Sequence, residues 1–231
     1  MTEDLDSAVG QVLAKLDELG IVDNTFVIFT SDNGYHGWNE GLEPLRGAKW
    51  WIWDGGLRVP LIVRGPGVPQ RSRSAVNVVG YDWLPTFADL GGASAHVPKD
   101  VDGVSLKPVL LGQPVSGSYA NRALYFHYPH YRVSPPASAI IIGDKKLLHF
   151  YEWPDQNFRY DLQGDLGEKN NIAAANPEES AQMFSQMMSR LKSVDAYFPK
   201  PNPKADPKMK KYDPNNLADQ GDFGPADPSD K

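Results

Sequence analysis

Two short apolar segments, residues 26–29 and 59–63, constrain the fold more than any other feature of the sequence. Residues 26–29 are apolar at every position, which is typical of a strand that is covered on both faces of a sheet. Residues 3–19 precede this strand and carry apolar residues at steps of three or four, the period of an amphipathic helix. A second, short helix, with Asp82 as its N-cap, is expected after the second strand. Helices that alternate with buried strands predict an α/β layer architecture.

The sequence changes character near residue 115. Four short segments split by Pro, Gly and Asp have the length and spacing of antiparallel strands: residues 123–128, 138–142, 146–151 and 158–162. A helix is expected from Asn176 to Val194, because Asn176 can cap it and Pro177 suits its first position. From Pro199 onward the chain has seven prolines and few apolar residues, which predicts an extended or disordered tail. We therefore expect three parts, at residues 1–115, 116–198 and 199–231.

The composition excludes several classes of function. The chain has 23 Lys and Arg against 29 Asp and Glu, a formal net charge of -6, whereas dedicated nucleic-acid binders carry a basic surface. Cysteine is absent from the 231 residues, which excludes disulfides, thiolate metal ligands and a cysteine nucleophile within this chain. No apolar run approaches the ~20 residues that span a bilayer. We therefore expect no nucleic acid among the partners of this chain and no membrane span.

Asp32 and Asn33 directly follow the first predicted strand. Ligand sites of α/β sheets lie beyond the carboxyl ends of strands, and carboxylate and amide oxygens suit Ca²⁺ or Mg²⁺ better than zinc. Gly34 allows the backbone to turn sharply, so that both side chains can face one ion. The same residues also form a common turn. Calcium needs roughly six to eight oxygens, so this pair alone does not complete a site.

Lys49 lies in a loop of small residues and is followed by three tryptophans, Trp50, Trp51 and Trp53. A lysine positioned in such a loop can stabilise an oxyanion. The alternative is a solvated lysine with tryptophans packed on the sheet. The loop sequence by itself leaves both interpretations open.

His127 and His130 form the third candidate, in a segment that also contains two tyrosines. A proline separates the two histidines, so one helix face is not expected to carry both. Aromatic residues and histidines often line ligand pockets, including those for sugars, while an ordinary strand end with buried tyrosines is the alternative. His36 follows Asn33 by three residues and could reach the same site or face water.

Taken in order along the chain, these segments resemble the formylglycine-dependent sulfatase family, within the alkaline-phosphatase-like superfamily. The strand that leads to Asp32 resembles the family's strand before its metal pair, and the loop around Lys49 resembles its lysine loop. The family often has a second glycine at the position of Ala48 and a glutamate at that of Asp54, and neither departure removes the lysine. The resemblance is carried by residues 22–34, 44–49, 54–60, 102–108 and 160–171.

The resemblance implies the distal part of an alkaline-phosphatase-like sulfatase α/β sheet domain, followed by a small subdomain of antiparallel sheet plus helix. Asp32 and Asn33 would be two ligands of an active-site Ca²⁺, and Lys49 would contact a sulfate oxygen and stabilise charge as the S–O bond breaks. Four residues would shape the pocket for the organic part of a sulfated small molecule or glycan: His36, Trp38, His127 and His130. Three matching acidic residues are interpreted as structural turn formers: Asp161, Asp165 and Glu168.

The nucleophile of that family is a formylglycine made from Cys or Ser in a Cys/Ser-x-Pro-x-Arg motif. The motif is absent from this sequence. Counterparts of the family's N-terminal acidic metal ligands, its catalytic histidine and its other sulfate-binding lysine are missing too. The simplest hypothesis is a truncated reading of a sulfatase, of which this chain is the C-terminal half. The missing N-terminal half, of about the same length, is then a candidate partner. We then expect an incomplete Ca²⁺ site, little hydrolysis by this chain alone, and exposed apolar surface on an incomplete sheet.

Two other functions stay open at this point. The chain could come from a related phosphoric-ester hydrolase, which shares the fold and parts of the metal site. It could also be a non-catalytic remnant that binds a sulfated glycan or a partner chain. A Thr or Ser nucleophile upstream would favour the first, and saturable glycan binding without turnover the second. The sequence assigns no compartment, although relatives in this family are commonly periplasmic, secreted or lysosomal.

Overall fold

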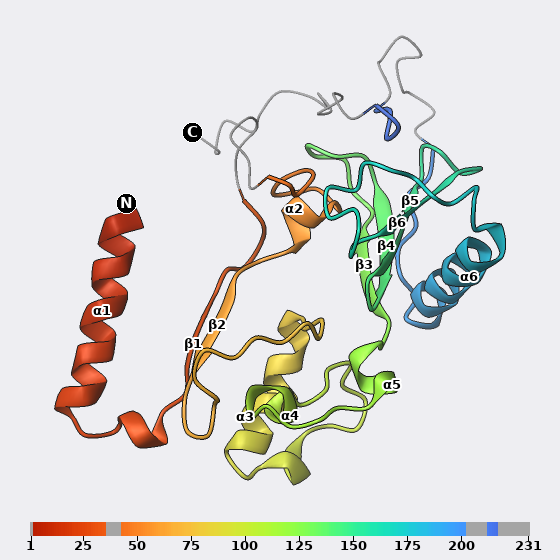
Figure 1. Cartoon of the computed structure of the whole chain (residues 1–231). Coiled ribbons are helices and arrows are strands. Elements are labelled where there is room, and N and C mark those ends of the chain that lie inside the picture. Colours follow the sequence, from red (N-terminus) through yellow and green to blue (C-terminus); the bar gives the residue numbers. More distant parts are fainter. Residues whose placement is uncertain (1, 36–42, 202–211, 217–231) are drawn as a thin grey trace. The chain divides into compact units, whose positions relative to one another are not determined.

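The computed structural model describes residues 2–35, 43–201 and 212–216 (Figure 1). Two compact units are present, and each is discontinuous in sequence. The first unit combines Met1–Ser31 with Pro60–Ala120, and the second combines Asp32–Val59 with Asn121–Lys231. The segment that carries Asp32, Asn33 and Lys49 therefore groups with the C-terminal residues of the chain. The domain boundaries expected from the sequence stay a prediction.

The first unit contains a long helix, a two-stranded sheet and several short helices. Strands β1 (Val27–Thr30) and β2 (Leu61–Arg64) pair antiparallel, with Ile28 opposite Val63. An ion pair of 3.6 Å between Asp17 and Arg64 connects α1 to β2. None of the described helices has the length and apolar content needed to cross a bilayer. The helices of this unit are α1 (Thr2–Glu18), α3 (Trp83–Leu90), α4 (Lys107–Leu110) and α5 (Gly117–Ala120), with 3₁₀ turns at Val22–Asn24, Gly80–Asp82 and Ser94–His96.

The expectation that the first strand is covered on both faces is wrong for the residues that the structure describes. There β1 has one strand partner, β2, and its side chains are half-buried or exposed. Ile62 on β2 is 65% exposed. The helix α1, which has the predicted apolar stripe, contains no buried residue. The periodicity of the sequence thus predicts the helix and the strand correctly, but not what covers them.

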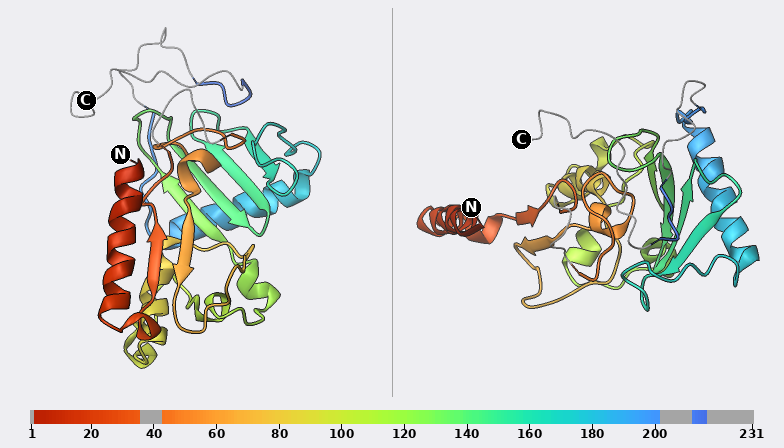
Figure 2. Two further views of the ribbon diagram at one scale, coloured as in Figure 1. Left: turned by 60° about the vertical axis from the view of Figure 1, so that its left-hand side comes forward. Right: turned by 90° about the horizontal axis from the view of Figure 1, so that it is seen from above.

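The second unit contains a four-stranded antiparallel sheet in the order β3-β4-β5-β6, followed by helix α6 (Pro177–Ser193) (Figure 2). All four strands begin and end within one residue of the segments that the sequence predicts. The short helix α2 (Asp54–Leu57) also belongs to this unit. The strands are β3 (Leu124–Tyr128), β4 (Ala137–Ile142), β5 (Lys145–Phe150) and β6 (Asn157–Asp161).

Both predicted helix caps are wrong in detail. The buried carboxylate of Asp82 accepts the backbone N–H groups of Val79 and Val104, each at 3.0 Å, instead of capping α3. The side-chain amide of Asn176 donates to the carbonyl of Ile172 at 3.1 Å and does not cap α6. The helices still begin at Trp83 and Pro177, next to these residues.

Each face of the four-stranded sheet has its own apolar core. Because side chains alternate along a strand, Leu148 and Phe150 of β5 pack on one face, in a cluster with Trp51 and Trp53. Leu147 faces the other way and packs with a row of α6 side chains: Met183, Met187 and Leu191. The tryptophan loop and α6 therefore cover opposite faces of one sheet.

Candidate functional site

Two backbone hydrogen bonds join the turn after β1 to the loop that carries Lys49. The N–H of Lys49 donates to the carbonyl of Tyr35 at 2.7 Å, and the N–H of Gly34 donates to the carbonyl of Gly56 at 3.0 Å. A Cβ on Gly34 would lie 2.0 Å from the carbonyl oxygen of Gly55, so this contact requires glycine. The structure thus brings the turn that contains Asp32 and Asn33 against the lysine loop.

Asp32 and Asn33 offer the oxygen ligands that a hard divalent cation prefers. Asp32 is exposed and Asn33 is half-buried at the end of β1. Within the described residues no three His, Asp or Glu side chains gather closely enough to hold a metal ion. Among the described residues the pair is therefore not a complete metal site, and its role as Ca²⁺ ligands stays a prediction.

Lys49 is half-buried, and its ammonium lies 5.2 Å from the ring centroid of Trp50. Trp50 has a φ of 74°, a left-handed conformation that is costly for a bulky residue. Its carbonyl accepts a hydrogen bond of 2.7 Å from the hydroxyl of Ser134. Trp51 and Trp53 are buried in the core, as one interpretation of the loop predicts. Among the described residues no carboxylate forms an ion pair with Lys49.

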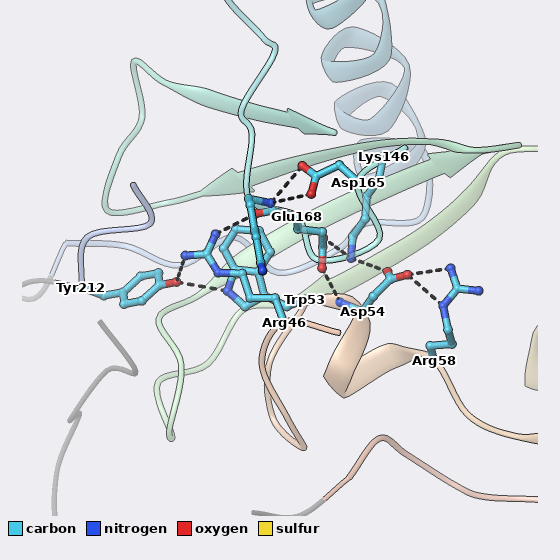
Figure 3. Close-up of polar contacts among 9 residues, drawn as sticks. Arg46, Trp53, Asp54, Arg58, Lys146, Asp165, Glu168 and Tyr212 are labelled. Carbon is cyan, nitrogen blue, oxygen red and sulfur yellow. Dashed lines mark hydrogen bonds and ion pairs between the residues drawn. The ribbon is translucent and has the colours of Figure 1, made fainter. Parts of the chain in front are cut away.

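A buried ionic cluster joins Asp54, Lys146 and Glu168 next to the loop that contains Lys49 (Figure 3). The ammonium of Lys146 on β5 lies 2.7 Å from Oδ1 of Asp54 and 2.8 Å from Oε1 of Glu168. Oε2 of Glu168 accepts the backbone N–H of Asp54 at 2.7 Å, and Arg58 donates twice to Oδ2 of Asp54. Lys146 and Glu168 are fully buried. The cluster therefore fixes helix α2 to the sheet a few residues after Lys49.

The two carboxyl groups of the cluster have opposite pKa shifts. Burial acts to raise the pKa of Asp54, but the charges and hydrogen bonds of Lys146 and Arg58 outweigh it, so this pKa lies below its usual value. Burial raises the pKa of Glu168, and the charge of Lys146 opposes this shift only in part. Asp54 is thus the carboxylate that the cluster stabilises in its ionised form.

Arg46 fastens the other end of the lysine loop. Its guanidinium carbon lies 3.8 Å from the ring centroid of Trp53, and the group donates to the Glu168 carbonyl at 3.2 Å and to the Tyr212 hydroxyl at 3.2 Å (Figure 3). The Tyr212 hydroxyl also accepts the indole N–H of Trp53 at 3.1 Å, and Tyr212 is buried. Part of the predicted tail therefore belongs to the core of the second unit.

Of the four residues predicted to shape the substrate pocket, the structure describes two, His127 and His130. Nδ1 of His127 lies 2.8 Å from the hydroxyl of Ser138, and Nε2 lies 2.7 Å from the carbonyl of Tyr197, so both ring nitrogens have protein partners. His130 is exposed. His36 and Trp38 lie outside the described residues. A substrate role for these four residues stays a prediction.

The three acidic residues interpreted as turn formers divide into two kinds. Asp161 accepts the N–H of Gln163 at 3.1 Å, and Asp165 accepts the N–H groups of Lys169 and Asn170, so both stabilise turns. Glu168 differs, because its carboxylate is a member of the buried cluster. The sequence pattern does not predict this role of Glu168, nor the roles of Lys146 and Tyr212. For Lys146 alone the sequence contains a hint of burial, because the alternation of side chains along β5 places it on the same face as Leu148.

Comparison with known proteins gives a consistent result. The family model described as N-sulphoglucosamine sulphohydrolase, C-terminal, matches residues 43–196. An N-acetylglucosamine-6-O-sulfatase of Bacteroides thetaiotaomicron is 32% identical over 204 residues, which cover 83% of this chain and 35% of that protein. A sulfatase of Formosa agariphila is 35% identical over 208 residues, which cover 82% of this chain and 37% of that protein. The chain thus spans little more than a third of the length of these relatives.

Solved structures agree. One is described as a complex with its substrate D-glucosamine-2-N,6-O-disulfate. It matches with a TM-score of 0.64 and 32% sequence identity, over 82% of this chain and 38% of the chain in that structure. Another is described as a complex with k-i-k-neocarrahexaose; it has a TM-score of 0.72, 26% identity, and coverage of 87% and 43%. The α/β architecture expected from the sequence is therefore confirmed, with antiparallel sheets and helices.

Proposed function

This chain belongs to the sulfatase family, whose C-terminal part it matches, and from that premise we propose that it supplies part of an active site that hydrolyses sulfate esters. In this proposal Asp32 and Asn33 are ligands of a divalent cation, Ca²⁺, and Lys49 binds the sulfate group. The observation that supports the proposal is the pair of backbone hydrogen bonds, Lys49 to Tyr35 and Gly34 to Gly56, which hold the turn that contains Asp32 and Asn33 against the loop that contains Lys49.

The proposed role of Lys49 is electrostatic. A positioned ammonium stabilises the negative charge that develops on sulfate oxygens in the transition state. Among the described residues, the ammonium of Lys49 lies over the ring of Trp50 at 5.2 Å, and no described carboxylate forms an ion pair with it. A bound cation would polarise the same sulfate group.

We propose a sulfated carbohydrate as the substrate class. The name of one similar sulfatase contains a sulfated amino sugar, and a similar solved structure is described as a complex with such a sugar as its substrate. In this proposal His127 and His130 help to shape the pocket for the organic part of the substrate. These assignments are proposals for this chain, because it spans only part of each of those proteins.

We further propose that the N-terminal portion of a sulfatase covers the exposed apolar surface of the first unit. The relatives are more than twice as long as the part that matches this chain. Leu5 and Val12 on α1, and Leu19 directly after it, are each more than half exposed, and a contiguous exposed apolar patch is typical of a surface that a partner covers. The nucleophile and the remaining metal ligands would then belong to that N-terminal portion.

The test of the proposed site is binding of D-glucosamine 6-O-sulfate to the full chain, measured by calorimetry with Ca²⁺ and with a chelator. We expect Lys49→Gln to weaken binding roughly tenfold or more, since a charge-assisted hydrogen bond contributes about 1.5–3 kcal/mol. Asp32→Asn should remove the Ca²⁺ dependence. The matched control is Lys99→Gln, an exposed lysine of the first unit that should leave binding unchanged.

The outcome separates the alternatives. Equal affinity in the wild type and in Lys49→Gln, with the fold intact by circular dichroism, would contradict the proposed site. Sulfate release is measured in parallel by ion chromatography. Binding that depends on Lys49, with no release even after a sulfatase N-terminal portion is added, would favour the non-catalytic glycan-binding remnant.

A further inference from the structure

A second cation, Arg132, contacts the same tryptophan ring as Lys49 and lies two residues after His130 in the sequence. The guanidinium carbon of Arg132 is 4.8 Å from the ring centroid of Trp50, and the ammonium of Lys49 is 5.2 Å from the same centroid. Because both distances are measured to the same centroid, the two charged groups are at most about 10 Å apart. Arg132 is exposed and Lys49 is half-buried. The indole of Trp50 thus carries two cations from segments more than 80 residues apart in sequence.

The loop of Arg132 is fastened to the lysine loop. Ser134 is 2% exposed, and its hydroxyl donates to the carbonyl of Trp50 at 2.7 Å. The backbone N–H of Arg132 donates to the carbonyl of Ser134 at 3.3 Å, which closes a tight turn. Arg132 is therefore positioned relative to Lys49 through Trp50, by contacts within the second unit.

The conformation of Trp50 also marks this place. A φ of 74° at a bulky residue costs on the order of 1–3 kcal/mol and persists only where the surroundings impose it. Here the Ser134 hydrogen bond and the adjacent buried Trp51 provide that constraint. The indole of Trp50 is only half-buried and contacts both cations, whereas Trp51 and Trp53 are buried in the core.

A ligand with negative groups that reach both cations gains a favourable Coulomb interaction with each of them. The guanidinium group of arginine presents a planar fork of donors that matches sulfate or carboxylate oxygens. Lysine provides a compact charge for a single group. The arrangement therefore fits a ligand with two negative groups on one sugar or on adjoining sugars.

We propose that Arg132 is a specificity-determining residue that binds a second sulfate group of the substrate, beside the ester sulfate that Lys49 binds. This proposal rests on the proposed function of Lys49. The substrate class is then a sugar that carries at least two sulfate groups, and a singly sulfated sugar uses only Lys49.

The test compares two ligands and three variants of the full chain by calorimetry in Ca²⁺. The ligands are D-glucosamine 6-O-sulfate and D-glucosamine-2-N,6-O-disulfate. We expect Arg132→Gln to weaken the disulfate roughly tenfold, the value of about 1.4 kcal/mol for one charge-assisted contact, and the monosulfate less than twofold. Lys49→Gln should weaken both. Arg73→Gln, an exposed arginine of the first unit, removes the same charge and should change neither.

Each outcome is decisive. If Arg132→Gln weakens both ligands equally, or neither, the role of Arg132 is overturned while that of Lys49 stands. If Lys49→Gln changes neither ligand, or the wild-type chain binds neither at millimolar concentration, the proposed function fails and this proposal fails with it. Arg132→Lys gives a finer measure, since it keeps the charge and loses the fork, and an intermediate loss is expected.

Discussion

Helices α1 and α6 have the same length, 17 residues, and both have an apolar stripe, yet they differ completely in burial. In α1 no residue is buried. In α6 four are buried, among them Met183, Met187 and Leu191, which pack on the four-stranded sheet. The difference shows that periodicity predicts a helix and the face that it would bury, while burial itself depends on a partner surface.

The same contrast distinguishes the two units. The second unit buries aromatic rings on one sheet face and aliphatic side chains on the other. The first unit leaves large apolar side chains exposed on its helix and on β2, such as Val12 at 58% and Ile62 at 65%. The proposed metal pair, Lys49 and Arg132 all belong to the second unit. The residues proposed for chemistry thus lie on the part of the chain that has a closed core.

The largest effect is expected from removing the central charge of the second unit. Lys146→Met should lower the free energy of unfolding by about 3–5 kcal/mol, because it removes the cation that pairs with buried Glu168 and leaves buried Asp54 with Arg58 alone. The measurement is urea unfolding followed by tryptophan fluorescence, since Trp51 and Trp53 are buried beside the cluster.

Lys145 is the matched control for this change. It is the neighbouring residue on the same strand, but its side chain is 51% exposed and pairs with Glu179 at the surface. Lys145→Met should cost less than about 1 kcal/mol, because water screens an exposed ion pair. Equal losses for the two lysines would contradict the importance of the buried cluster.

A direct comparison of the two helices comes next in size. Met187→Ala should destabilise the protein by about 2–5 kcal/mol, since this side chain is fully buried in the core under α6. Val12→Ala on α1 should change stability by less than about 0.5 kcal/mol, because Val12 is 58% exposed. Thermal unfolding by circular dichroism measures both. A large loss for Val12→Ala would mean that α1 packs against a surface in solution, for example in a self-associated chain.

These contrasts show how much of the fold the sequence could predict. The four strands of the second unit and α6 follow from local signals, namely short β-rich segments, turn residues and a helical period. Asp32, Asn33 and Lys49 are candidates because of their chemistry and their positions after a strand and in a loop, and the resemblance to sulfatases implies a specific role for each. The prediction for the environment of β1 is wrong: its apolar side chains predict burial, but the described residues leave them half-buried or exposed.

The missed residues are those whose roles depend on distant partners. Glu168 follows a turn and looks like part of it, but its carboxylate meets Asp54 and Lys146 from other parts of the chain. Tyr212 lies in a proline-rich segment and yet joins Trp53 in the core. Arg132 becomes a candidate only when Trp50 brings it beside Lys49. No local period encodes such contacts, because they join segments that are far apart in sequence.

The smallest effect concerns the pH dependence of the second unit. His149 on β5 is 5% exposed, its Nδ1 lies 3.0 Å from Oδ1 of Asn157, and its ring packs on Phe184 of α6. Burial lowers the pKa of His149 below its usual value, and the hydrogen bond to Asn157 offsets this only in part. The unfolded chain therefore binds a proton at this histidine more readily than the folded chain does.

The sign of the effect follows from that difference. Above the unfolded pKa, about 6.5, His149 is neutral in both states and costs nothing. As the pH falls from there towards the lower folded pKa, the unfolded state gains a proton first, so stability declines by at most about 1.4 kcal/mol per pH unit. His149→Gln should therefore flatten the decline in unfolding free energy between pH 7.5 and 5.5, measured by urea titrations at each pH. His96→Gln, at an exposed position of the first unit, is the control. An identical slope in the wild type and in His149→Gln would show that the buried face under α6 admits the charged ring, and the contrast between the closed and the open unit would then be weaker than their burial indicates.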